Sequence, residues 1–198
     1  MIVCQITTIW YCTYRIIVLL LQLQNISNKK NIIEMKTTIV IYGSSTGTCE
    51  SVAQSIAAKL GVQAMNVQDM TADTVNNHDN LILGTSTWGA GEMHDDWYDG
   101  VKTMQSCNLA GKCIALFGTG DAESYSDTFV GGMGELYNAL KDSGAHFVGS
   151  VDTADYSFTD SDAVIGGMFV GLPIDEINEE EKTEQRINEW VARISPNL

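Results

Sequence analysis

Short apolar runs alternate with helical patterns from about residue 37 to the end of the chain. We predict strands at 37–42, 62–67, 80–85, 112–118 and 146–151. We predict helices at 48–60, 97–106, 125–142 and 180–194, and a weak one at 72–77. Apolar residues recur in the helical patterns at intervals of three and four. This alternation predicts one α/β domain, a doubly wound, five-stranded parallel sheet with helices on both faces.

In a sheet of this kind, ligands bind at the carboxyl ends of the strands. Three segments should therefore meet at one edge: the loop that follows the first strand, residues 85–99 and residues 118–128.

The first of these loops has the composition of a phosphate site. Gly43 is followed by Ser44, Ser45, Thr46, Gly47, Thr48 and Cys49, and a helix begins there. Backbone N–H groups, hydroxyls and the positive end of a helix dipole suit a small anion. The loop contains no Lys or Arg and matches neither the Walker pattern nor the dinucleotide fingerprint. This favours a phosphomonoester over a nucleoside triphosphate; an ordinary Ser/Gly-rich turn is the alternative.

The other two segments each carry an aromatic residue among small ones. Trp88 lies in the run from Thr85 to Glu92, and Tyr125 comes four residues after Asp121. Aromatic side chains on two loops that face one gap would sandwich a flat conjugated ring.

The charge of the chain limits its partners. The formal net charge is -14, and residues 1–34 are slightly basic, so the excess of acid lies in the remainder. This argues against nucleic acid and anionic membranes and is compatible with a basic protein partner. Five Cys without a CxxC pair indicate reduced thiols in a cytoplasmic protein, and no metal site is expected. We interpret His78, His94 and His146 as structural or surface residues.

Residues 1–34 do not share the pattern of the rest. Residues 3–22 are apolar, but Arg15 interrupts them, and no signal-peptide cleavage site follows. We predict that Met35 is the true start, that 1–34 is extraneous or disordered, and that 35–198 forms the domain. A membrane anchor is the alternative.

The motifs of the three loops together resemble those of the long-chain flavodoxins. The phosphate loop resembles T/S-x-T-G-x-T, Thr87-Trp88-x-x-Gly91-Glu92 resembles the first ring loop, and Gly118-Thr119-Gly120-Asp121-x-x-x-Tyr125 resembles the second. Residues 152–172 resemble the insertion, about 20 residues long, that splits the last strand. The resemblance implies the strand order 2-1-3-4-5, one non-covalent FMN, and a monomeric carrier that moves single electrons at low potential between redox proteins.

The resemblance also implies which residues bind the cofactor. They are Ser44, Ser45, Thr46, Gly47, Thr48, Cys49, Ser86, Thr87, Trp88, Gly89, Gly91, Thr119, Gly120, Asp121 and Tyr125. At Gly89 the family uses a peptide carbonyl that turns toward the flavin, for which glycine has the needed freedom. Cys49 departs from the usual Thr, so a hydroxyl contact to phosphate is lost, and Cys49→Thr should tighten FMN binding. The alternative is that the thiol is only a small filler at the helix start, and a third interpretation is that the helix start lowers its pKa.

The partners implied are redox proteins, a reductase donor and acceptor enzymes. They would dock on an acidic rim made of Glu92, Asp95, Asp96, Asp121 and Glu123. No catalytic residue is expected. The alternative is an FMN-dependent NAD(P)H quinone or azo-dye reductase. A phosphoacceptor signalling domain would need an acidic cluster after the first strand, where this chain has Gly43 and Ser44.

Overall fold

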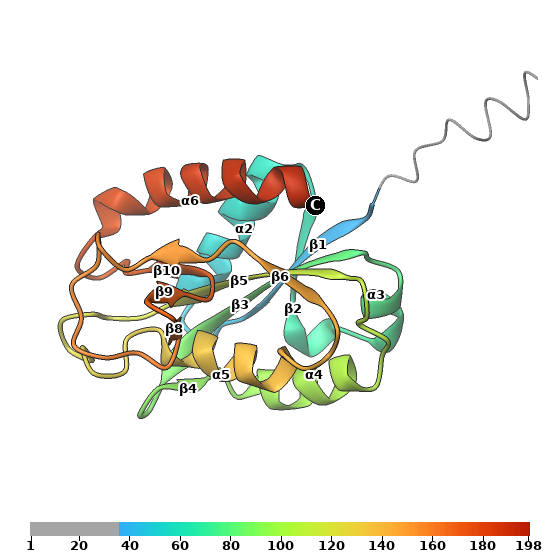
Figure 1. The fold of residues 1–198 in the computed structure, drawn as a ribbon, viewed down its shortest axis with the longest axis horizontal. Helices are drawn as coiled ribbons and strands as arrows, with labels where there is room; N and C mark the ends of the chain where they lie inside the picture. The colour runs from blue at the N-terminus through green and yellow to red at the C-terminus, as the bar shows by residue number, and fades with distance from the viewer. Residues whose placement is uncertain (1–35) are drawn as a thin grey trace, which may run out of the picture. The chain divides into compact units, whose positions relative to one another are not determined.

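A parallel sheet forms the centre of the part of the chain that the structure describes, residues 36–198 of a computed structural model (Figure 1). Its strands are β1 (Thr38–Gly43), β2 (Gln63–Asn66), β3 (Asn80–Trp88), β5 (Cys113–Thr119), β6 (His146–Val148) and β10 (Leu172–Ile174). Their order is β2-β1-β3-β5, and both β6 and β10 pair with the outer edge of β5. All these pairings are parallel. The predicted fold class and strand order are confirmed.

The predicted boundary at Met35 and the interpretation of residues 1–34 fall outside the described residues and stay predictions. Within residues 36–198, no helix combines the length and the hydropathy that a membrane span requires.

Helices cover both faces of the sheet. α2 (Thr48–Leu60) and α6 (Glu180–Ile194) pack together on one face, and α3 (Ala72–Asn76), α4 (Asp96–Gln105) and α5 (Gly131–Leu140) cover the other (Figure 1). Short 3-10 turns, η1 (Val67–Asp69) and η2 (Ser195–Asn197), follow β2 and α6. With helices on both sides, the aliphatic side chains of β1, β3 and β5 are buried on both faces of the sheet.

The last strand of the sheet is split, as the resemblance implied. β6 pairs with the first half of β5, Cys113 to Ala115, and β10 pairs with its second half, Phe117 to Thr119. Between them, β7 (Val151–Asp152), β8 (Val164–Ile165) and β9 (Met168–Phe169) form a small antiparallel sheet. The predicted strand 146–151 was too long. It ends before Gly149, which has a φ of 85° and accepts a hydrogen bond from Trp190 Nε1 at 2.7 Å.

Two other predicted boundaries were wrong for reasons that concern the ligand edge. β3 continues past residue 85 to Trp88 because its end pairs antiparallel with β4 (Glu92–Met93). α5 begins at Gly131 instead of 125 because turns occupy the intervening residues: Thr128 N–H donates to the Tyr125 carbonyl, and Gly131 N–H to that of Thr128. The glycines at the helix start let its backbone approach Gly91, since a Cβ on Gly131 would lie 2.8 Å from the Gly91 carbonyl oxygen.

Gly84 in β3 offers a test of how tightly the sheet packs. A Cβ there would overlap the ring of Phe117, which is fully buried. Gly84→Ala should therefore lower the free energy of unfolding by about 1–3 kcal/mol through overpacking. Phe117→Leu removes the ring and is the matched second change. Urea unfolding measures the stability of both single variants and of the double variant. The double variant should lose less unfolding free energy than the two single variants lose together, and strictly additive losses would contradict the overlap.

Candidate functional site

A cavity of about 310 Å³ opens at the carboxyl edge of the sheet. It is lined by residues from the ends of β3 and β5, the start of α2 and two further loops. The lining residues are Thr46, Thr48, Ser86, Thr87, Trp88, Gly89, Thr119, Gly120, Asp121, Tyr125, Thr128, Phe129, Val130, Glu176 and Ile177. The three segments predicted to converge therefore meet at one site. No Lys, Arg or His is among the residues that line the cavity.

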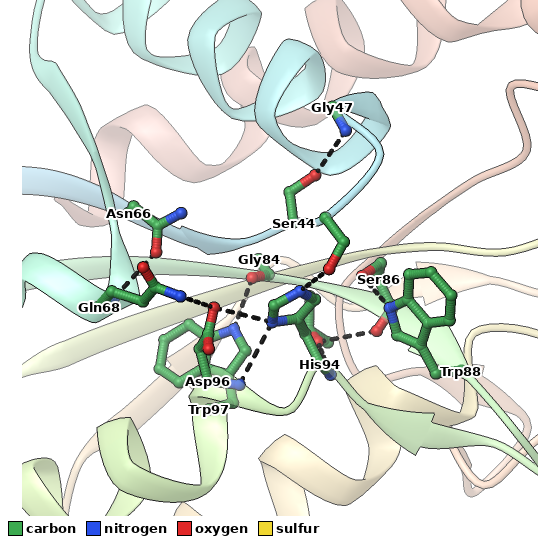
Figure 2. Close-up of polar contacts among 12 residues, drawn as sticks. Ser44, Gly47, Asn66, Gln68, Gly84, Ser86, Trp88, His94, Asp96 and Trp97 are labelled. Carbon is green, nitrogen blue, oxygen red and sulfur yellow. Dashed lines mark hydrogen bonds and ion pairs between the residues drawn. The ribbon is translucent and has the colours of Figure 1, made fainter.

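The loop after β1 presents the start of a helix to this cavity. α2 begins at Thr48, and Gly47 before it has a φ of 91° and provides no side-chain cap for the first turn. The first amides of a helix have no partner within the helix, so here they remain available to an anion. The loop itself is held by a hydrogen bond from Gly47 N–H to Ser44 Oγ at 3.2 Å (Figure 2).

Two exposed aromatic side chains lie at the cavity, Trp88 with 44% and Tyr125 with 57% of its surface accessible. Ligand pockets are typically lined by apolar and aromatic side chains, and the position of these two rings at the cavity fits that pattern. Trp88 is held in orientation because its Nε1 donates to Ser86 Oγ at 2.8 Å (Figure 2). Together the two rings form apolar walls suited to a flat ligand.

The turn after Trp88 depends on glycine. Gly91 N–H donates to the Trp88 carbonyl at 3.0 Å, and Gly89 and Gly91 have φ values of 51° and 110°. The Ala90 N–H donates to Glu92 Oε2 at 2.5 Å, which closes the turn. A side chain at Gly89 would overlap that carboxylate. Gly89 therefore adopts a positive φ, which glycine does at little steric cost.

One buried polar atom in the cavity wall has no partner. The Thr87 hydroxyl oxygen is inaccessible to solvent and makes no hydrogen bond with any of residues 36–198. Buried hydroxyls are almost always hydrogen-bonded. Each of these features fits one part of a ligand. The unpaired hydroxyl suits a polar group, the uncapped helix start suits a phosphate, and the two aromatic walls suit a flat ring.

Comparisons with known proteins agree with this geometry. The family model described as flavodoxin matches residues 40–190. Flavodoxin 1 of Azotobacter vinelandii is 41% identical over 160 residues, which are 77% of this chain and 92% of that one. Flavodoxin of a Picosynechococcus strain is 37% identical over 161 residues, 79% and 95% of the two chains. The chain belongs to the flavodoxin family.

Solved structures point the same way. Fusobacterium nucleatum flavodoxin bound to flavin mononucleotide superimposes on this flavodoxin with a TM-score of 0.77 at 29% identity. The match covers 83% of this chain and 99% of that one. A mutant of the same Fusobacterium protein, also bound to flavin mononucleotide, gives a TM-score of 0.78 at 30% identity, with 83% and 98% covered.

Some predicted binding residues of this flavodoxin lie beside the cavity and not in its lining. Ser44 and Ser45 line an adjacent polar hollow together with Asn66, Gln68, Trp88, His94, Asp95 and Asp96. Gly47, Cys49 and Gly91 line neither space. Trp88 stands between the two, since it lines both. The assignment of all fifteen residues to cofactor binding stays a prediction.

Cys49 is the residue whose predicted chemistry was wrong. Its side chain is fully buried, and this burial raises the pKa of the thiol well above its ordinary value, although the Thr119 side chain opposes the shift through a hydrogen bond. The expected lowering by the helix start does not occur, because the thiol points into an apolar core. The side chain therefore packs as a small core residue, while its backbone N–H remains part of the helix start.

Sequence reasoning missed five lining residues, in two groups. Thr128 lies in the predicted segment 118–128 but was not named as a binding residue, and Phe129 and Val130 were assigned to a helix. Glu176 and Ile177 belong to a loop after β10 that no motif indicated. Ile177 is 71% exposed, which is unusual for an isoleucine. Val130 has a φ of 48°, a conformation that costs a β-branched residue energy and that clusters at functional sites.

A buried carboxylate fastens the missed loop to the second ring loop. Asp175 is fully buried, and its oxygens accept hydrogen bonds from the N–H groups of Ala122, Ile177 and Asn178. The Asn178 amide donates to Asp175 at 2.8 Å and to Asp121 at 2.9 Å, so it bridges the two loops. This network fixes the position of Ile177 relative to the cavity.

Asp121 is the other acid in this network. Hydrogen bonds from the backbone N–H of Ser124 at 2.9 Å, from Asn178 and from the Glu123 N–H hold the pKa of Asp121 below its usual value. A lowered folded-state pKa means that the carboxylate stabilises the fold above its unfolded pKa near 4. That contribution is lost as the pH falls through the lower, folded-state value.

Asp121→Asn should therefore weaken the fold at neutral pH and reduce the loss of stability below about pH 4. Urea unfolding midpoints measured over a pH series check this. Asp127→Asn is the matched control, since Asp127 lies in the same loop, is exposed and makes no side-chain hydrogen bond among the described residues. Equal acid dependence in Asp121→Asn and the wild type would contradict the prediction.

Proposed function

We propose that this flavodoxin holds FMN in the cavity between Trp88 and Tyr125, with the phosphate at the start of α2, and passes electrons to partner proteins at the rim of that cavity. The observation that carries the proposal is one continuous cavity that joins an uncapped helix start to two exposed aromatic rings. As a member of its family, the protein is an FMN-binding electron carrier and not an enzyme with a substrate of its own. When bound, FMN supplies the one-electron chemistry.

The residues of the chain divide the binding task between them. The phosphate is held by neutral donors of the phosphate loop, without Lys or Arg. These donors are backbone amides and the hydroxyls of Thr46 and Thr48. The Trp88 indole, fixed by Ser86, and the Tyr125 ring cover the two faces of the flavin ring system. A rotation of the Thr87 side chain toward the cavity would give its hydroxyl the hydrogen-bond partner that it lacks among the described residues.

The Gly89 carbonyl is a candidate acceptor for a hydrogen bond from an N–H group of the flavin. Gly89 lies in the exposed turn beside the cavity and tolerates both signs of φ. A rotation of its peptide therefore has little steric cost. Glu92 closes this turn through the Ala90 N–H, so its carboxylate also restrains the rotation.

Partners would dock where the aromatic rings reach the surface. The exposed acids Glu92, Asp95 and Glu123 lie next to residues of the two ring loops, and Asp96 and Asp121 are half-buried beside them. Opposite charge steers association and accelerates it at low salt. We therefore infer a basic partner surface with an apolar centre that meets Trp88, Tyr125 and Ile177. We also propose that the carrier is a soluble cytoplasmic monomer, as the family resemblance implies.

The unpaired hydroxyl tests the cofactor assignment. Thr87→Val keeps the shape of the side chain and removes an oxygen that has no partner in the free protein. We expect the stability of the apoprotein to be unchanged or raised, and FMN to bind about tenfold more weakly. Thr87→Ser retains the hydroxyl and is the control. Quenching of FMN fluorescence measures the affinities, and an unchanged dissociation constant in Thr87→Val would count against this site.

Charge reversal tests the docking surface. Glu123→Lys should slow electron transfer from the reduced protein to cytochrome c, a basic haem protein, by about threefold to tenfold at low ionic strength. The difference should shrink as salt screens the charge. Asp142→Lys makes the same charge change beyond the far end of α5 and should have a smaller effect. Stopped-flow absorbance gives the rates; equal slowing by both variants would refute docking at this rim.

A further inference from the structure

His94 is a buried histidine beside the phosphate loop that the proposed function does not use. Only 5% of its surface is accessible. Its backbone N–H donates to Thr85 Oγ1 at 2.9 Å, and its ring packs edge-on against Trp88 with centroids 6.5 Å apart. The ring therefore has a fixed place between the end of β3, the start of α4 and the loop after β1.

Both ring nitrogens have partners, and they connect different elements. Nε2 lies 2.7 Å from Ser45 Oγ in the phosphate loop. Nδ1 lies 3.3 Å from the Asp96 carboxylate and accepts a hydrogen bond from the Asp96 backbone N–H at 3.3 Å (Figure 2). The same carboxylate oxygen accepts a hydrogen bond from Gln68 Nε2 at 2.8 Å. His94 thus ties the phosphate loop to α4 and, through Asp96, to η1.

The protonation state of the ring decides what Ser45 can do. If Nδ1 alone carries the proton and donates to Asp96, Nε2 accepts the Ser45 hydroxyl proton. If the ring is an imidazolium, Nδ1 donates to Asp96 and Nε2 donates to Ser45 Oγ, which leaves the hydroxyl proton free. If Nε2 alone carries the proton, it donates to Ser45 and Nδ1 accepts from the Asp96 N–H. Only the cation donates to both the Asp96 carboxylate and Ser45, and it gives up the hydrogen bond from the Asp96 N–H.

The charges around the ring are few. Asp95 and Asp96 face the hollow from the start of α4, while Asn66, Gln68, Ser44 and Ser45 face it from the other elements and are neutral. On the cavity side no Lys, Arg or His lines the wall. An imidazolium at His94 would be the cationic group nearest to the phosphate loop among the residues that line these two spaces.

We propose that His94 is a positioning residue of the phosphate loop, holding Ser45 and, when protonated, supplying beside the FMN phosphate the positive charge that the loop itself lacks. The inference rests on the proposed binding of FMN. It follows that the affinity for FMN rises as the pH falls through the titration of the histidine, and that riboflavin, which has no phosphate, does not share this dependence.

The test compares two ligands and two proteins over pH. Dissociation constants of FMN and riboflavin are measured by fluorescence quenching from about pH 5.5 to about pH 8.5, a range that includes the ordinary titration of histidine. The variant His94→Gln keeps a polar side chain without a charge, and its profile shows what the titration of the phosphate, near pH 6, contributes alone. Relative to this variant, the wild type should gain about threefold to tenfold in FMN affinity at the acid end.

A second readout requires no change at His94. By linkage, if protonation of the ring favours FMN, then bound FMN must favour protonation of the ring. The double variant His78→Gln/His146→Gln keeps His94 as its one histidine, so its NMR spectra report the imidazole titration of that residue. The midpoint of this titration should move to higher pH when FMN is bound and stay unchanged when riboflavin is bound.

The outcomes separate the two proposals. Parallel FMN profiles in the wild type and His94→Gln, or the same pH dependence for riboflavin, would overturn the role of His94 and leave FMN binding intact. No binding of FMN at any pH would overturn the proposed function and this inference together. A pH-dependent gain that is confined to FMN and lost in His94→Gln supports the proposal.

Discussion

The parallel register of β1, β3 and β5 determines where everything else in this flavodoxin lies. Gly43 at the end of β1 is level with Thr85 in β3, and Thr85 is level with Gly118 in β5. The carboxyl ends of the three strands therefore lie side by side at one edge, with β3 extending three residues further to Trp88. The phosphate loop and both ring loops begin from these points, so the distance between the helix start and the aromatic rings is set by the spacing of strands. Loops alone could not maintain that distance.

Neutral donors and acids both occur at this cavity. Its wall contains hydroxyl side chains and two carboxylates, Asp121 and Glu176, but no cationic side chain. Further exposed acids, Glu92, Asp95 and Glu123, lie on the loops beside it. A negative rim disfavours an anionic ligand, so the uncapped amides of α2 and the buried His94 both matter more here than they would on a neutral protein. In the proposed function the same acids steer a basic partner once the cofactor is bound.

Much of this could be predicted because strong local patterns coincide with tertiary structure. The buried strands, the amphipathic helix with Ile187 and Trp190, and the Ser/Thr/Gly loop each carry their signal within about ten residues. Prediction failed where a residue has two readings. Phe129 fits a helical apolar stripe, yet it is buried from a turn that lines the cavity. Cys49 stands at a helix start, yet the direction of its side chain, which no pattern gives, places the thiol in the core. His94 contacts Ser45, which lies 49 positions earlier in the chain, and Asp175 contacts Ala122, which lies 53 positions earlier. Contacts between residues so far apart in the chain cannot be predicted from sequence spacing.

The division of the last strand has a consequence for the solubility of the folded chain. A full-length edge strand would offer a long row of unpaired amides and carbonyls, which is a template for strand exchange and fibrillar aggregation. Here that edge consists of two pieces of three residues each, β6 and β10, and the central residue of β10 is Pro173, which has no amide hydrogen to donate. The insertion that separates β6 from β10 thus also disfavours pairing of this sheet edge with a strand of another copy of the molecule.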